Sequence, residues 1–95
     1  MISGQTSVSW SRTPRAVHRE VLDGALVARV EGGDLVELNE TGAALWRELA
    51  IPGTVPQLAD RLASEFDAPT AEVAAGIMPV IEVLHQRGLL ERSGP

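Results

Sequence analysis

The sequence predicts an α+β fold, arranged as a winged helix-turn-helix, in which a three-stranded antiparallel meander precedes three helices. Two observations support this prediction. The apolar residues follow the strand period of two as far as residue 38, and after it they recur with the helical period of about 3.6 residues. Two dipeptides that suit tight turns, Asp23-Gly24 and Gly32-Gly33, divide the first part into three short runs. Strands grouped before helices are typical of α+β domains.

The three expected strands cover residues 17–22, 25–31 and 34–38, and the last of them forms one edge of the sheet. A two-residue turn before residue 34 sets Arg29 opposite Val36 and Val27 opposite Leu38. The side chains of Val27, Val36 and Leu38 then share the core face, because alternate residues of a strand point to opposite faces.

Each of the three expected helices has a recognisable start or end. Asn39 is a good N-cap for the first helix. Thr54 and Gln57 have the spacing of a capping box at the start of the second helix. Thr70 is the expected cap of the third helix, and Gly88 suits the left-handed residue that follows its last turn.

The chain length of 95 residues suits one domain. Residues 1–13 are rich in Ser, Thr and Gly, and we expect a flexible tail there that contains Trp10. The folded domain is expected over residues 14–91, with a short C-terminal tail at 92–95.

Composition narrows the classes of function. Eight basic residues against thirteen acidic ones give a net charge of −5, which is unfavourable for binding DNA, RNA or an anionic membrane. The absence of cysteine removes disulfides and thiolate chemistry. No apolar run approaches the roughly 20 residues that cross a bilayer, and the N-terminus lacks the apolar core of a secretory signal. We therefore expect a soluble, cytoplasmic protein.

The sequence offers few candidates for catalysis. His18 and His85 lack partners at metal-ligand spacing, and no Ser lies in a nucleophile-elbow setting. Glu37 and Glu40 are better explained as an exposed strand charge and an acidic residue in the first turn of a helix. We expect no enzyme activity, no catalytic residue, no metal and no cofactor.

A binding role has more support, because the edge strand at 34–38 offers unpaired backbone groups to which an extended peptide could add. At about 100° per residue, the third helix presents Val73, Ile77 and Ile81 among its core residues. One flank of this helix carries Met78, and the other carries Val83; the sequence leaves open which flank faces the edge strand. The candidate binding residues are Asp34, Leu35, Val36, Glu37, Val73, Ile77, Met78 and Ile81.

Three segments resemble the PqqD-like family. LNETGAALW at residues 38–46 is similar to the family's "LN-x-T-[AG]…W" signature. GTVPQLA at 53–59 resembles the start of its second helix, and LHQRGLL at 84–90 resembles its "L…GLL" close. The similarity covers roughly residues 14–91, with the three motifs in order and correctly spaced.

The resemblance implies a RiPP recognition element, a domain that binds the leader of a ribosomally made precursor peptide. In that family the leader adds as an antiparallel strand to the third strand and lies against the third helix, which correspond here to residues 34–38 and 73–81. The implied partners are a precursor leader peptide and a leader peptidase, a cyclase or a radical SAM maturation enzyme, with a lasso-peptide pathway preferred. Asn39 and Trp46 are expected to be structural.

Two alternatives remain. A winged-helix DNA-binding regulator would use the third helix as its recognition helix, but that helix carries Glu72 and Glu82 with only Arg87 as a formal cation. A dimerisation module would use exposed Leu35 and Met78 as its contact patch. We expect a monomer or a weak homodimer, because a strand edge can also pair with its own copy.

Overall fold

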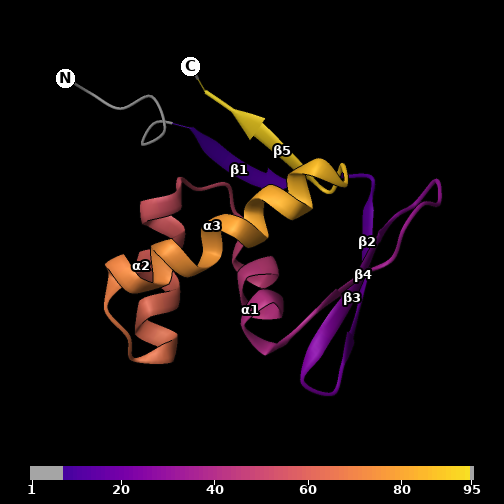
Figure 1. The fold of residues 1–95 in the computed structure, drawn as a ribbon. Coiled ribbons are helices and arrows are strands. Elements are labelled where there is room, and N and C mark those ends of the chain that lie inside the picture. Colours follow the sequence, from indigo (N-terminus) through magenta and orange to yellow (C-terminus); the bar gives the residue numbers. More distant parts are fainter. Residues whose placement is uncertain (1–7, 95) are drawn as a thin grey trace.

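The computed structural model describes residues 8–94 and confirms the predicted α+β class, with a three-stranded antiparallel sheet and three helices (Figure 1). A second sheet of two strands was not predicted. In chain order the elements are β1 Ser9–Arg12, β2 Ala16–Val21, β3 Gly24–Arg29, β4 Val36–Leu38, α1 Glu40–Glu48, α2 Val55–Phe66, α3 Thr70–Gln86 and β5 Leu90–Ser93.

The two-stranded sheet joins the ends of the chain. β1 pairs with β5 in antiparallel register, with Trp10 opposite Arg92. The prediction of tails at 1–13 and 92–95 is therefore wrong for residues 9–12 and for residues 92–93, while residues 1–7 and 95 lie outside the described part. The tail was misjudged because a polar strand that pairs with a partner about 80 residues away carries no local apolar pattern.

The main sheet has the strand order β2-β3-β4, so β4 is an edge strand as predicted. Its register differs from the prediction: Val36 lies opposite Val27, and Leu38 lies opposite Ala25. The connection is not a two-residue turn but a longer loop over residues 30–35. The amide of Val30 donates to the carbonyl of Arg15 at 2.6 Å, which keeps the end of β3 with β2 rather than with β4.

The turn between β2 and β3 lies one residue earlier than predicted. Val21 pairs with Gly24, so Leu22 and Asp23 form the turn, and Asp23 has the left-handed φ of 65°. Gly24 opens β3 instead. A Cβ at this position would lie 2.1 Å from the carbonyl oxygen of Leu38, so only glycine lets the two strands approach this closely.

The helix caps follow the sequence at two of three positions. The side chain of Asn39 accepts from the amide of Gly42, and Thr54 and Gln57 form the complete capping box. The N-cap of α3 is Pro69 rather than Thr70, and it makes no side-chain cap bond. The Thr70 hydroxyl instead donates to the Asp60 carboxylate at 3.1 Å, which joins the start of α3 to α2.

The core is mainly aliphatic and lies where α1 meets β3, α2 and α3. Trp46 of α1 is its largest member and is 1% exposed. The remaining fully buried large side chains are Val27, Leu45, Leu49, Leu58, Leu62, Ile77, Ile81, Leu84 and Leu89. Val36 packs at the margin of this cluster and so anchors the edge strand to the core.

Candidate functional site

The edge strand β4 presents a free side to solvent. It pairs with β3 on one side, and within residues 8–94 no strand pairs with its other side. Leu35, just before β4, is 61% exposed, and the side chain of Glu37 is exposed as well. Unpaired donors and acceptors on such an edge are a template for an added strand.

The register indicates which residue of β4 offers its backbone at this edge. In an antiparallel sheet, alternate residues direct their N–H and C=O groups to opposite sides of the strand. The two-residue hairpin closed by Val21 and Gly24 directs the backbone groups of Gly24 toward β2, and hence those of Val27 toward β4. Val36, opposite Val27, then bonds to β3, and Glu37 directs its N–H and C=O to the free edge.

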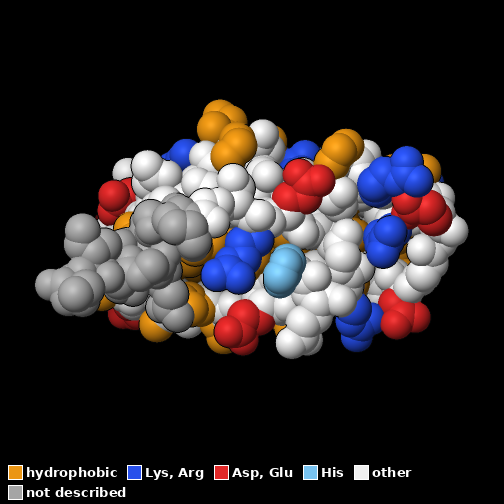
Figure 2. Space-filling view, turned by 90° about the horizontal axis from the view of Figure 1, so that it is seen from above, with side chains coloured by type: hydrophobic (Ala, Val, Ile, Leu, Met, Phe, Trp, Pro, Cys, Tyr) orange, Lys and Arg blue, Asp and Glu red, His pale blue; other side chains and the backbone are white. Residues whose placement is uncertain are grey.

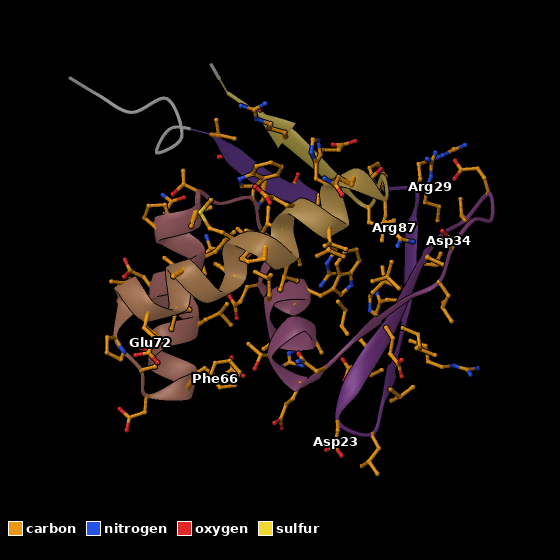
Figure 3. All side chains as sticks on the ribbon, in the orientation of Figure 1. Asp23, Arg29, Asp34, Phe66, Glu72 and Arg87 are labelled. Carbon is orange, nitrogen blue, oxygen red and sulfur yellow. The ribbon has the colours of Figure 1, made fainter. Side chains whose placement is uncertain are left out.

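An ion pair establishes which flank of α3 faces β4. Arg87 Nη1 lies 2.9 Å from Asp34 Oδ2, two residues before β4 begins (Figure 3). At about 100° per residue, Val80, Val83 and Gly76 lie on the same flank as Arg87. Val80 is half-buried, Val83 is 45% exposed, and a Cβ at Gly76 would meet no atom within 4 Å. This flank is therefore open and partly apolar.

The opposite flank of α3 faces the two-stranded sheet. The ring of His85 lies edge-on to that of Trp10, with the ring centroids 5.1 Å apart. Met78 is on the flank of His85 and is 38% exposed. The candidate residue Met78 therefore lies away from β4, and Trp10 lies on the far side of α3 from that strand.

The structure brings together only some of the candidate residues. Ile77 and Ile81 are each 2% exposed, so they belong to the core beneath the surface, and Val73 is half-buried beside them. Asp34 and Leu35 precede β4 rather than belonging to it. We name as the β4–α3 surface the residues Asp34, Leu35, Val36 and Glu37 together with Val73, Gly76, Val80, Val83 and Arg87.

Charged side chains gather at one end of this surface, where α3 ends and the loop 30–35 lies. Glu31 pairs with both Arg15 and Arg29, and Arg87 pairs with Asp34. The pKa of Glu31 is lowered, first by a hydrogen bond from its own backbone and then by Arg15. Figure 2 shows arginine and acidic side chains together at one end of the face seen from above. Three guanidinium groups meet two carboxylates there, which leaves one positive charge in excess.

A separate cleft of about 200 Å³ lies between the β2–β3 turn and the helices α1 and α2. Arg47, which pairs with Glu65 at 3.3 Å, lines it together with the half-exposed ring of Phe66. Figure 3 shows Asp23 and Phe66 far from Arg87. Among residues 8–94 no group of three or more His, Asp or Glu side chains is placed to hold a metal ion.

These features define a small α+β domain with an open strand edge beside a partly apolar helix flank. The chain matches the family model of coenzyme PQQ synthesis protein D (PqqD) over residues 24–90, and it belongs to that family. The match starts at β3 and ends as β5 begins, so it includes β4 and all three helices. No curated protein sequence matches the chain.

Two solved structures are similar. The first is TbiB1 in complex with the TbiA(beta) leader peptide, with a TM-score of 0.73 and 17% identity over 85% of this chain and 94% of that one. The second is the solution structure of the PqqD truncation of PqqCD from Methylobacterium extorquens, described as a functional, stand-alone RiPP recognition element. It has a TM-score of 0.66 and 26% identity over 96% of this chain and 95% of that one.

The sequence named only part of the helix side of the surface. Val73 was among the predicted binding residues, but Gly76, Val80, Val83 and Arg87 were not, because the flank of α3 that faces β4 depends on tertiary contacts. Within the described residues no helix is long and apolar enough to cross a membrane.

Proposed function

We propose that this protein binds the leader segment of a ribosomally synthesised precursor peptide and presents it to a maturation enzyme, without catalysing a reaction itself. The observation that carries the proposal is the free edge of β4 beside the open flank of α3, in a chain of the PqqD family. The solved relatives support it, because one of them contains a leader peptide and the other is a stand-alone recognition element.

The chemistry of the β4–α3 surface suits an extended peptide. Glu37 supplies main-chain groups for strand addition, which binds any sequence. Val80 and Val83 supply apolar contact for alternate side chains of the peptide, and such contacts discriminate between sequences. Strand addition also completes the sheet and removes its open edge.

The proposal also covers the fold type, the partner enzymes, the compartment and the oligomeric state. The proposal includes a winged-helix description of the fold, with the domain binding a peptide rather than DNA. The partner enzymes are a leader peptidase, a cyclase or a radical SAM enzyme, with a lasso-peptide pathway preferred, and the compartment is the cytoplasm. Without peptide the protein is a monomer or a weak homodimer.

Fluorescence anisotropy tests the proposal directly. Labelled leader peptides encoded by precursor genes beside this one are titrated with the protein, and scrambled peptides and a labelled DNA duplex serve as controls. We expect saturable binding with a micromolar or tighter Kd for one leader only. If no leader binds, or if the duplex binds with a steep salt dependence, the leader-binding function is wrong.

A further inference from the structure

The ion pair between Arg87 and Asp34 joins the two sides of the β4–α3 surface at one end. Both side chains are well exposed, with 47% of Arg87 and 82% of Asp34 accessible to solvent. Exposed ion pairs contribute about 0–1 kcal/mol, because both groups are also well hydrated when apart. Another carboxylate can therefore replace Asp34 at Arg87 at little cost.

The surroundings of Arg87 favour an added negative charge. Arg29 lies next to the end of α3, since a Cβ on Gly88 would come within 2.9 Å of its Nη1 atom. Its carboxylate partner, Glu31, is shared with Arg15. This end is thus locally cationic on a protein whose net charge is −5, and Figure 3 shows Arg29, Asp34 and Arg87 together there.

The position of the Arg87–Asp34 pair determines which residue of a bound peptide carries the negative charge. A strand added at Glu37 continues past residues 36 to 34, because successive residues of a strand advance about 3.3 Å. A peptide residue two or three positions from the one paired with Glu37 then passes Asp34 and Arg87. At the other end of α3, the first turn carries the acidic residue Glu72, which Figure 3 shows far from Arg87.

We infer that Arg87 is a specificity-determining residue that selects an Asp or Glu side chain at this position of the peptide, with Asp34 occupying Arg87 until the peptide arrives. The inference rests on the proposed function and adds the chemistry of one recognised side chain. Arg87 contacts the peptide through its guanidinium, so the peptide carboxylate replaces that of Asp34 in a charge-assisted hydrogen bond.

Selection from a displayed library of random 12-residue peptides tests this inference without knowledge of the natural leader. The protein is used as wild type, as Arg87→Glu and as Arg47→Glu. Arg47 is a matched control, because it also forms an exposed ion pair, with Glu65, but lines the separate cleft at Asp23 and Phe66, which Figure 3 shows far from Arg87. Circular dichroism establishes that all three are folded.

On the wild type and on Arg47→Glu we expect enriched peptides to share apolar positions and an acidic residue at one fixed spacing from them. On Arg87→Glu the acidic residue should be replaced by Lys or Arg at the same spacing. If Arg87→Glu selects the same acidic peptides as the wild type, the inference is wrong while the proposed function stands. If the wild type enriches no peptide, both fail.

A binding measurement with one enriched peptide gives the size of the effect. Changing its acidic residue to the amide should weaken binding to the wild type about two- to fivefold, the range of exposed ion pairs. The same change should leave binding to Arg87→Gln unaltered. Asp34→Asn should tighten binding of the acidic peptide by a similar factor, because the competing carboxylate is gone; unchanged affinity would exclude Asp34 as the competitor.

Discussion

Val36 of β4 lies opposite Val27 of β3. A tight turn at Gly32-Gly33 would have placed Leu38 opposite Val27 instead. The shift is two residues, so it leaves every side chain on its predicted face and changes only the length of the ladder. β4 has three paired residues, and the middle one, Glu37, directs its backbone N–H and C=O groups outward. The edge that we propose as the peptide-binding site is thus short and centred on Glu37.

Replacing Glu37 with proline should abolish peptide binding while the domain stays folded. Proline has no N–H to donate, but at an outward-facing position of an edge strand it removes no bond to β3. The Glu37 side chain is exposed, so no packing is lost. Anisotropy with an enriched peptide measures the loss of binding, and thermal melting measures the stability of the fold.

Proline at Val36 is the matched control. It should destabilise the domain, because the Val36 N–H bonds to β3 and the side chain packs at the margin of the core. A stable Val36→Pro protein together with an unfolded Glu37→Pro protein would show that the outward-facing residue has been assigned to the wrong position.

A charge on the flank of α3 that faces β4 should weaken binding more than the same charge on the other flank. Val83→Glu places a carboxylate on the flank of Arg87, whereas Met78→Glu places it on the flank of His85. Both side chains are partly exposed, 45% for Val83 and 38% for Met78, so both variants should fold. We expect about a tenfold or greater loss for Val83→Glu, the size of one apolar contact of at least 1.4 kcal/mol. Equal losses would mean that the peptide does not lie along the Val83 flank.

Local signals in the sequence were sufficient for much of the fold. The Asn39 cap and the Thr54–Gln57 capping box were predicted correctly because each depends on residues within one helical turn. The order of strands and helices followed from the change of apolar period. Thr70 failed as a cap because its hydroxyl bonds to Asp60 of another helix, which no local rule anticipates.

The candidate site was predicted less completely, because it depends on how distant segments meet. The edge strand was identified from its place in the meander. Of the helix side only Val73 was named. Met78 and Val83 occupy equivalent flanks of α3, and only the pair between Arg87 and Asp34, 53 residues apart in sequence, distinguishes them. Ile77 and Ile81 were named correctly as core residues but were also taken as contacts, which their burial does not allow without rearrangement.

Lowering the pH should uncouple Glu31 from its arginine partners only below the pKa of an ordinary glutamate. The pKa of Glu31 lies below its ordinary value of 4.5 because the folded state bonds the ionised form. A carboxyl group with a lowered pKa stabilises the fold above its unfolded pKa, and this contribution is lost as pH falls through the folded value. Carboxyl chemical shifts measured against pH should give a midpoint below 4.5, and Arg15→Gln should raise it. A wild-type midpoint at or above 4.5 would contradict the hydrogen bonds that the Glu31 carboxylate accepts.

Arg12 should stabilise the domain by capping the end of α1 from β1. Its Nε donates to the carbonyl of Trp46 at 2.8 Å, and its guanidinium carbon lies 5.0 Å from the centre of the Trp46 ring. The last carbonyls of a helix lack partners within the helix and carry partial negative charge, so a cation there is favourable. Partial burial lowers the pKa of Arg12, but the group stays charged at neutral pH.

Arg12→Gln should therefore lower the free energy of unfolding by about 2 kcal/mol, the sum expected for one charged hydrogen bond and one cation–π contact. Urea denaturation measures the difference. Arg19→Gln on the exposed strand β2 is the control and should change stability by less than about 0.5 kcal/mol. An effect of Arg12→Gln no larger than that of Arg19→Gln would contradict this capping role of Arg12.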